Sequence, residues 1–207
     1  MTDFNDKQIQ ILQVAEKLFA AKGFDGTSIR NISKEAKINI AMVSYYFGSK
    51  EKLLERLIYF RTRDLKVKLE NLFKEELVPL EKIERFIELY IGKVDQNRDM
   101  YQILHFEISS NKRAMDLKAF TAIKKGNLLS LIKIIEEGQA QNIFKKDINI
   151  PLLIPTILGT YFHFHSNKPF FKEILNLNTE EQYNIYIKNE LTKHIQQTIK
   201  SLIVYEK

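Results

Sequence analysis

Apolar residues recur with the three-to-four-residue spacing of amphipathic helices along most of the chain. The segment 6–22 shows this spacing first, and Gly23 follows it where a helix C-terminus favours glycine. Ser28, Asn39 and Ser49 precede further periodic segments, and their side-chain oxygens can accept hydrogen bonds from first-turn amides. The pattern therefore predicts helices over 6–22, 28–36, 39–47 and 49–73.

The rest of the chain has the same period. Pro79 interrupts the fourth segment, and the residues from Thr179 to Gln182 form a capping-box sequence before the last one. The alternating patch at 160–165 fits the end of a buried helix that starts near Pro151 or Pro155. We therefore expect an all-α fold, with further helices over about 80–96, 99–110, 113–138, 152–166 and 179–204.

Composition narrows the class of protein. The 207 residues are 44% hydrophobic and 28% charged, as in ordinary globular chains, and the lack of cysteine excludes disulfides and thiolate chemistry. No apolar run reaches the roughly 18 residues of a membrane span, and the first residues lack a signal-peptide core, so we expect a soluble cytoplasmic protein. The net charge of +6 is spread along the chain, so a nucleic-acid role depends on where particular residues lie.

The stretch 23–54 predicts a helix-turn-helix. Two helices of roughly two turns are joined by about three residues, and the second helix of such a motif enters the DNA major groove. The inward positions are Ile29, Ile32, Ala36, Ile38, Val43 and Phe47, and the outward positions of the second helix are Ile40, Ala41, Met42, Ser44 and Tyr45. Two large apolar residues beside a serine and a tyrosine suit base edges and thymine methyl groups.

Polar residues around this motif suit DNA phosphates. Ser28 and Lys50 lie at predicted helix N-termini, where free amides and the helix dipole favour an anion. Tyr45 and Tyr46 offer hydroxyls, and Arg30 offers a charged fork. Such contacts fix the register on the duplex without reading its sequence.

Plainer interpretations compete with these roles. Ile40 and Met42 could be core residues, although the inward stripe is already complete without them. Arg30 and Lys50 could be solvated charges, and for Arg30 the two interpretations are evenly balanced.

Residues of about 8–58 resemble the DNA-binding domain of the TetR family of bacterial regulators. The matching positions are Gly23-Phe24, Thr27-Ser28, Ile32, Ala36, Ile38-Asn39, Tyr46-Phe47 and 49–53. The remainder matches that family in layout. The resemblance implies a three-helix DNA-binding head over 1–48 and, over 49–207, a long connecting helix and a helical bundle. That bundle would bind a small molecule and dimerise through the last two long helices, about 152–166 and 179–204.

Carried over by position, the resemblance implies phosphate contacts at Ser28, at Tyr45 or Tyr46, and at Lys50, and base contacts on the second helix and at Arg30. The candidate DNA-binding residues are Ser28, Arg30, Asn39, Ile40, Ala41, Met42, Ser44, Tyr45, Tyr46 and Lys50. Three positions depart from the family pattern: Ser44 replaces a common tyrosine, Ser33 an alanine and Lys37 the turn glycine. Lys37 must therefore adopt a turn conformation that glycine usually supplies.

Two groups of side chains could bind ligands elsewhere. Phe86, Tyr90, Tyr101 and His105 are candidate walls of an effector pocket, with core packing as the alternative. His163 and His165 are two residues apart on a predicted helix and point to different faces, so we expect a buried or interface role and no metal site.

These patterns favour a sequence-specific transcriptional regulator. We expect a ligand-responsive homodimeric repressor that binds operator DNA and an unknown small-molecule effector, and that is neither an enzyme nor a holder of a cofactor. The alternative is a helical ligand-binding or scaffold module without DNA binding, which the unremarkable charge of the head and Ser44 suggest. A helical hydrolase or metal enzyme lacks every motif that its chemistry needs.

Overall fold

Polar side chains start the first helices of the chain. In a computed structural model, which describes residues 4–110 and 118–205, these helices are α1 (Asp6–Lys22), α2 (Ile29–Glu35), α3 (Ile40–Phe47) and α4 (Lys50–Phe73). Asn5 and Ser28 form capping boxes before α1 and α2, and Asn39 Oδ1 accepts a hydrogen bond from a first-turn amide of α3. Ser49 Oγ accepts the Lys52 N–H at 3.2 Å at the start of α4. The predicted helix starts are therefore confirmed.

Packing divides the chain into two compact units. The N-terminal unit comprises Met1–Asp64 and Gln96–Ile123, and the C-terminal unit comprises Leu65–Asp95 and Lys124–Lys207. Both α4 and α7 (Lys118–Ala140) run through the two units. The predicted domain boundary after residue 48 remains a prediction.

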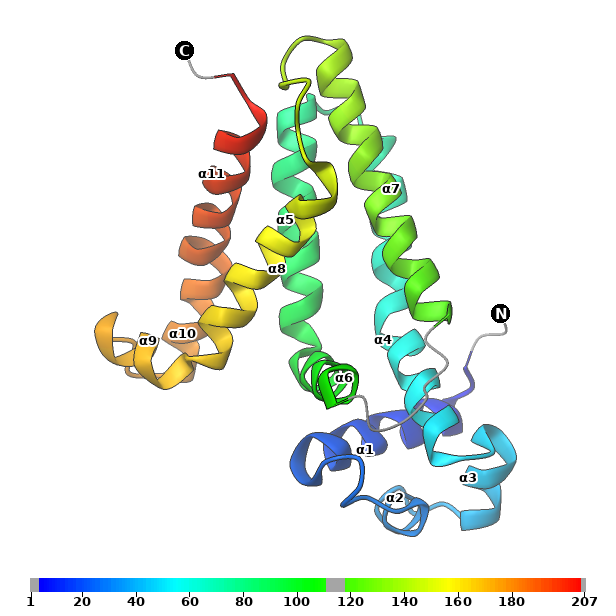
Figure 1. Cartoon of the computed structure of the whole chain (residues 1–207). Helices are drawn as coiled ribbons and strands as arrows, with labels where there is room; N and C mark the ends of the chain where they lie inside the picture. The colour runs from blue at the N-terminus through cyan, green and yellow to red at the C-terminus, as the bar shows by residue number, and fades with distance from the viewer. Residues whose placement is uncertain (1–3, 111–117, 206–207) are drawn as a thin grey trace. The chain divides into compact units, whose positions relative to one another are not determined.

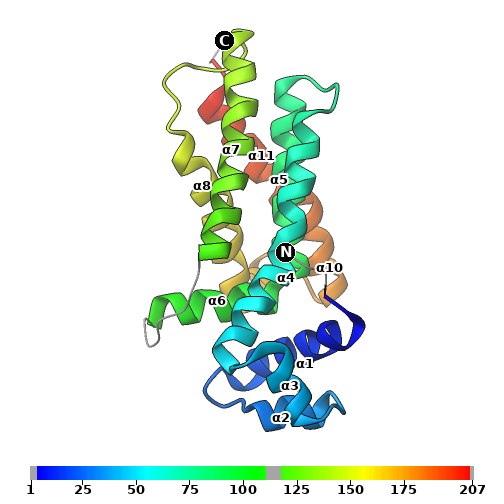
Figure 2. The same ribbon diagram turned by 90° about the vertical axis from the view of Figure 1, so that its right-hand side faces the viewer.

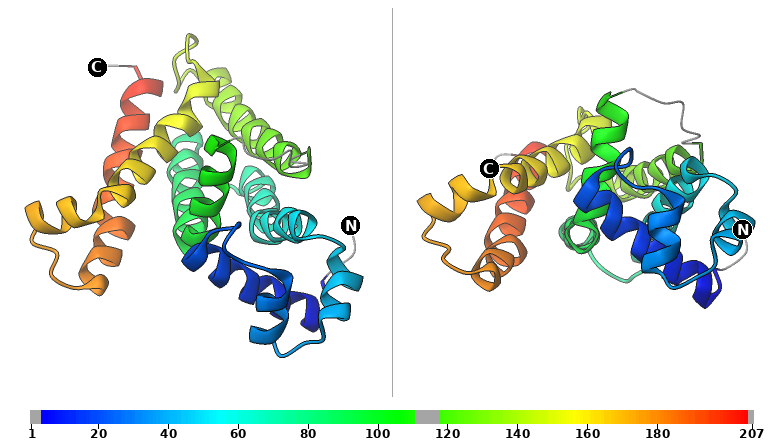
Figure 3. Two further views of the ribbon diagram at one scale, coloured as in Figure 1. Left: turned by 60° about the horizontal axis from the view of Figure 1, so that its bottom comes forward. Right: turned by 90° about the horizontal axis from the view of Figure 1, so that it is seen from below.

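The N-terminal unit is built on one apolar core. In it α1 packs against α2 and α6 (Arg98–Ser110), and α2 packs against α3, as Figures 1 and 3 show. The side chains that α1, α4 and the helix-turn-helix contribute to this core include Ile11, Leu12, Phe19, Ile32, Val43, Phe47, Leu53, Leu54, Leu57 and Ile58. The motif is therefore held from behind by α1 and the first half of α4.

The C-terminal unit begins with a similar apolar stripe. Pro79 opens α5 (Pro79–Gln96), where its missing N–H costs nothing. Residues at helical spacing on α5 are buried, including Ile83, Phe86, Tyr90 and Val94. α7 supplies Leu131, Ile134 and Ile135 to the buried residues of the same unit. Predicted residues 113–117 of this helix lie outside the described part of the chain.

The last helices add detail that the sequence left open or missed. α8 (Ile150–Ser166) starts with Pro151 in its first turn and carries Pro155 inside it. α9 (Lys168–Ile174) was not predicted. The predicted helix over 179–204 is helical from residue 180 to residue 203, but a π-helical turn interrupts it: α10 (Glu180–Tyr186), η1 (Ile187–Leu191) and α11 (Thr192–Ile203) follow one another without a gap. α10 and α11 form one column in Figure 1, and Figure 2 shows the two helices from another side. Thr192 Oγ1 donates to the Ile187 carbonyl at 2.8 Å within this turn.

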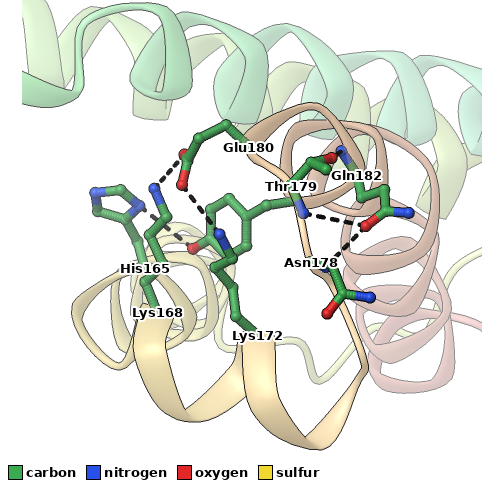
Figure 4. Close-up of polar contacts among 8 residues, drawn as sticks. His165, Lys168, Lys172, Asn178, Thr179, Glu180 and Gln182 are labelled. Carbon is green, nitrogen blue, oxygen red and sulfur yellow. Dashed lines mark hydrogen bonds and ion pairs between the residues drawn. The ribbon is translucent and has the colours of Figure 1, made fainter.

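Ion pairs and ring contacts connect α8, α9 and α10 (Figure 4). Glu180 accepts hydrogen bonds from Lys168 and Lys172 at 2.5 and 3.2 Å, and these bonds hold the pKa of its carboxyl below the usual range. The buried Tyr183 ring lies beside His165 and under the Lys168 ammonium. Thr179 and Gln182 form the predicted capping box. Within the described residues, no helix has the length and apolar composition that crossing a membrane requires.

Candidate nucleic-acid interface

α3 presents two different faces. Val43 and Phe47 are buried on its inner side, as predicted. On its outer side Tyr45 is 84% and Ile40 is 47% exposed, and Ala41 and Ser44 are also exposed. Leaving large apolar side chains in water has a cost, so this outward face is suited to contact with another surface. Met42 and Tyr46 are half-buried at the edges of that face.

The N-terminus of α2 lies in the same motif. Ser28 is exposed, and its hydroxyl oxygen accepts the Asn31 N–H at 3.1 Å. Its N-cap role is thus established by geometry, while phosphate contact stays a prediction. Arg30 is exposed in the first turn of this helix, and its carbonyl accepts a hydrogen bond from the buried Ser33 hydroxyl at 3.0 Å. The serine that replaces the usual alanine therefore has a partner.

Lys50 fastens the loop before α2. Its ammonium donates hydrogen bonds to the Phe24 and Thr27 carbonyls, both at 2.8 Å, and lies 4.2 Å from the centre of the Phe24 ring. The Thr27 hydroxyl in turn donates to the Gly23 carbonyl at 2.9 Å. Sequence reasoning missed this clamp, because the contacts join residues more than 20 positions apart in the chain. A solvated lysine is therefore the wrong description of Lys50, and its predicted phosphate contact is untested.

Lys37 adopts the conformation expected of it. Its φ is +52°, in the left-handed region, at the turn between α2 and α3. The Ile38 N–H then donates to the Ser33 carbonyl at 3.0 Å and closes the turn. The motif thus tolerates a lysine at the turn, at the cost of the strain that a Cβ meets there.

The predicted effector residues fall into two groups. Phe86 and Tyr90 are buried in the C-terminal unit, with ring centres 5.6 Å apart. Tyr101 packs half-buried against the core of the N-terminal unit, and His105 is exposed on α6. The structure therefore shows Phe86 and Tyr90 as neighbours in one unit, and Tyr101 and His105 belong to the other unit.

Asn127 is a polar residue that the sequence reasoning missed. It is 3% exposed on α7, its Nδ2 donates to Tyr90 Oη at 3.4 Å, and its buried Oδ1 has no hydrogen-bond partner among the residues that the structure describes. Burial raises the pKa of the Tyr90 phenol, and the bond from Asn127 lowers it by less, so the phenol stays neutral and able to donate. An asparagine four residues from the buried Ile123 and Leu131 was the available signal, because it interrupts an apolar stripe.

The two histidines of α8 have different surroundings. His163 is exposed, and the half-buried His165 stacks on Tyr161 with their rings 4° from parallel. Among the described residues, no group of three or more histidine, aspartate or glutamate side chains could hold a metal ion.

Two family models match the chain. The model for bacterial regulatory proteins of the tetR family matches residues 11–57, and the model for the tetracyclin repressor-like C-terminal domain matches residues 79–199. The curated HTH-type transcriptional repressor NicS of Pseudomonas putida is 32% identical over 169 residues, which cover 76% of this chain and 75% of NicS. The probable HTH-type transcriptional regulator YttP of Bacillus subtilis is 25% identical over 181 residues, or 78% and 84% of the two chains.

The fold has solved counterparts. The crystal structure of the transcriptional regulator FadR from Bacillus subtilis in complex with stearoyl-CoA aligns with a TM-score of 0.70 at 19% identity, and covers 93% of this chain and 97% of that one. The likeness confirms the expected all-helical fold with an N-terminal helix-turn-helix and a helical C-terminal part.

Proposed function

The chain belongs to the TetR family of DNA-binding transcriptional regulators, and from this premise we propose that it is a homodimeric, ligand-responsive repressor of a palindromic operator. Membership makes it a transcription factor and not an enzyme, as expected. The observation that carries the proposal is the exposed outer face of α3, where Ile40 and Tyr45 stand in solvent while Val43 and Phe47 anchor the helix. NicS, the relative with the highest identity given above, is named a repressor, which favours repression here.

Operator binding is testable with the full chain. A gel-shift or fluorescence-anisotropy titration on the DNA upstream of its own gene should give a complex at low salt. The affinity should fall with salt at a slope of about −0.9 per phosphate neutralised, because each contact releases counterions. Two-fold symmetry predicts half-sites separated by one or more turns, or multiples of about 34 Å. Failure to bind this DNA or any other duplex in dilute buffer would contradict the proposal.

Exposed apolar side chains support dimerisation through the last helices. Leu152 of α8 is 56% exposed, and Ile185 of α10 and Leu202 of α11 are 52% and 47% exposed. A Cβ added at Gly159 on α8 would meet no atom within 4 Å, so a partner helix could approach closely there. Such faces are costly in water and stable once a second copy covers them.

A matched pair of substitutions tests this interface. Leu152→Arg places a charge on the proposed face, and Leu129→Arg does so on α7, where the leucine is similarly exposed, 57% against 56%. Sedimentation should give a folded monomer for the first and a dimer for the second. A dimeric Leu152→Arg variant would place the interface elsewhere.

The buried pair Tyr90–Asn127 supports an effector site in the C-terminal unit. The neutral phenol offers a donor, and Asn127 Oδ1 offers an acceptor without a partner, which costs about 1–3 kcal/mol when left unsatisfied. A polar group of a ligand would satisfy both. Since the solved FadR is in complex with stearoyl-CoA, stearoyl-CoA is the first probe for this chain.

Asn127→Leu separates stability from response. It removes the orphaned acceptor but also takes the Asn127 hydrogen bond away from the buried Tyr90 hydroxyl, so we expect little change in melting temperature, while release of operator DNA by stearoyl-CoA is lost. Ser130→Ala, on the next turn of α7, is the control and should keep the response. A variant that is destabilised yet fully responsive would exclude Asn127 from effector binding.

A further inference from the structure

A cleft of about 780 Å³ opens in the N-terminal unit beside the recognition helix α3. Its walls are the end of α3, one face of α4 and the first turn of α7, all within the N-terminal unit. The volume is in the range of sites for small organic molecules. The lining residues on which the argument depends are Tyr46, Lys52, Arg56, Tyr59, Lys118 and Phe120.

α4 gives this cleft two uncompensated cations. Lys52, Arg56 and Tyr59 follow one another at i, i+4 and i+7, so they share one side of the helix. In the described part of the chain, the exposed side chains of Lys52 and Arg56 make no hydrogen bond or ion pair. Further along the same helix, Arg61 donates hydrogen bonds to both carboxylate oxygens of Glu16.

The remaining walls add aromatic rings. Tyr46, Tyr59 and Phe120 are half-buried around the cleft, whose described lining also includes Lys118 and Glu55. Rings favour a flat apolar body, and a guanidinium matches a carboxylate with two parallel hydrogen bonds. The complementary ligand is therefore a small aromatic carboxylate.

The cleft also reaches the proposed DNA-contacting face. The Tyr46 ring, which lines the cleft, makes an edge contact with the Tyr45 ring at 5.5 Å between centres, and Tyr45 is 84% exposed on the outer face of α3. An anion bound in the cleft would also neutralise positive charge next to α3. That charge would otherwise attract the phosphates of DNA.

We propose that this cleft is a second effector site, which binds a small aromatic carboxylate and thereby weakens DNA binding. The cleft does not depend on the Tyr90–Asn127 site. Binding of the carboxylate stands by itself, and only its effect on the affinity for operator DNA rests on the proposed DNA contact by α3. Because coupling between two sites is reciprocal, operator DNA must weaken binding of the carboxylate by the same factor.

The test uses the full chain and 2-naphthoate as probe, with calorimetry for binding and anisotropy for operator affinity. Wild type should bind 2-naphthoate, and its DNA dissociation constant should rise about tenfold at saturation, a coupling within the usual range. The double variant Lys52→Gln/Arg56→Gln removes the charges, and Ala119→Leu fills the lining of the cleft without changing charge. Lys68→Gln, at an exposed position of α4 outside the cleft, is the control.

Binding that is lost in both cleft variants, kept in Lys68→Gln and about tenfold weaker for neutral 2-naphthamide would support the site. No binding at millimolar concentration, or binding that survives in the cleft variants, overturns it. Binding that leaves the DNA dissociation constant unchanged overturns the coupling. Operator affinity without 2-naphthoate is read in the same titration, so a failure of DNA binding itself is recognised separately.

Discussion

Two lysines, one in each compact unit, make nearly the same contacts. Lys50 donates a hydrogen bond to the carbonyl of Phe24 and lies over that residue's ring. Lys82 does the same with Phe73, with its ammonium 3.2 Å from the carbonyl oxygen and 5.3 Å from the centre of the ring. The difference is in their remaining partner. Lys82 is 5% exposed and pairs with Glu137 at 2.9 Å, whereas half-buried Lys50 pairs with no carboxylate among the described residues.

The charge of Lys82 is neutralised within the protein, whereas the charge of Lys50 is available to attract an anion. Burying Lys82 without Glu137 would leave an uncompensated charge, so the two side chains must be kept together. The carbonyls around Lys50 orient its ammonium and leave its charge in place, next to the exposed N-terminus of α2. A clamp of this kind can also attract a phosphate, so the structural and DNA-binding roles of Lys50 are compatible.

The largest effect is expected in the C-terminal unit. Lys82→Met removes the cation but keeps the length of the stem, and leaves Glu137 with its side chain 26% exposed and unpaired. Breaking such a pair should lower the free energy of unfolding by about 2–4 kcal/mol, below the value for full burial because Glu137 keeps some solvent. Urea denaturation measures it.

The control adds Glu137→Met. The double variant should recover most of the lost stability, because an apolar pair of similar volume often replaces a buried ion pair without loss. Operator affinity of the folded Lys82→Met protein should be unchanged. A loss of affinity there would erase the distinction between the two lysines.

In the N-terminal unit the matching change should show chiefly in DNA binding. Lys50→Met should lower stability by about 1–2 kcal/mol, because the lost bonds are only half-buried. If Lys50 also neutralises one phosphate, affinity should fall for every DNA sequence, and the salt slope should become shallower by about 0.9. Anisotropy at several salt concentrations measures it. An unchanged slope would make Lys50 a clamp alone.

Local signals explain why the helix-turn-helix was predictable from sequence. Asn5, Ser28, Asn39 and Ser49 each bond to first-turn amides, so helix starts are determined by residues within four positions. No side-chain cap bond starts α8 or α9. The π-helical turn in the predicted helix over 179–204 has no comparable signal, and the short α9 is held by rings such as Phe171 on Phe164, 4.4 Å apart. Such elements depend on tertiary packing, which periodicity does not show.

The candidate site divides in the same way. The outward set Ile40, Ala41, Met42, Ser44 and Tyr45 follows from helical period, and all of these residues except the half-buried Met42 are exposed. The partners of Lys50 and the orphaned oxygen of Asn127 depend on contacts between segments distant in the chain. The sequence therefore predicted the outer face of α3, and it did not predict the polar contacts of Lys50 and Asn127.

A smaller effect on operator affinity should distinguish base contacts of α3 from the attraction of DNA phosphates by positive charge. Met42→Ala should cost about 1 kcal/mol at one or two base pairs through lost apolar contact, most clearly at thymine-containing steps. Non-specific affinity and the salt slope should stay as in wild type, unlike in Lys50→Met. Competition with single-base operator variants measures it. A uniform loss over all variants would show that Met42 has no base-reading role.

The smallest expected difference is in stability, and it again compares one residue from each unit. Lys37 and Asn142 both have positive φ, +52° and +56°, where a lysine is strained and an asparagine is tolerated. Lys37→Gly relieves about 1 kcal/mol of strain but frees the unfolded chain, so a net gain of about 0.5 kcal/mol is expected. Asn142→Gly relieves less strain for the same entropic loss and should be neutral or slightly destabilising. Urea denaturation of both variants measures the difference, and a Lys37→Gly protein no more stable than wild type would show that the turn holds lysine without strain.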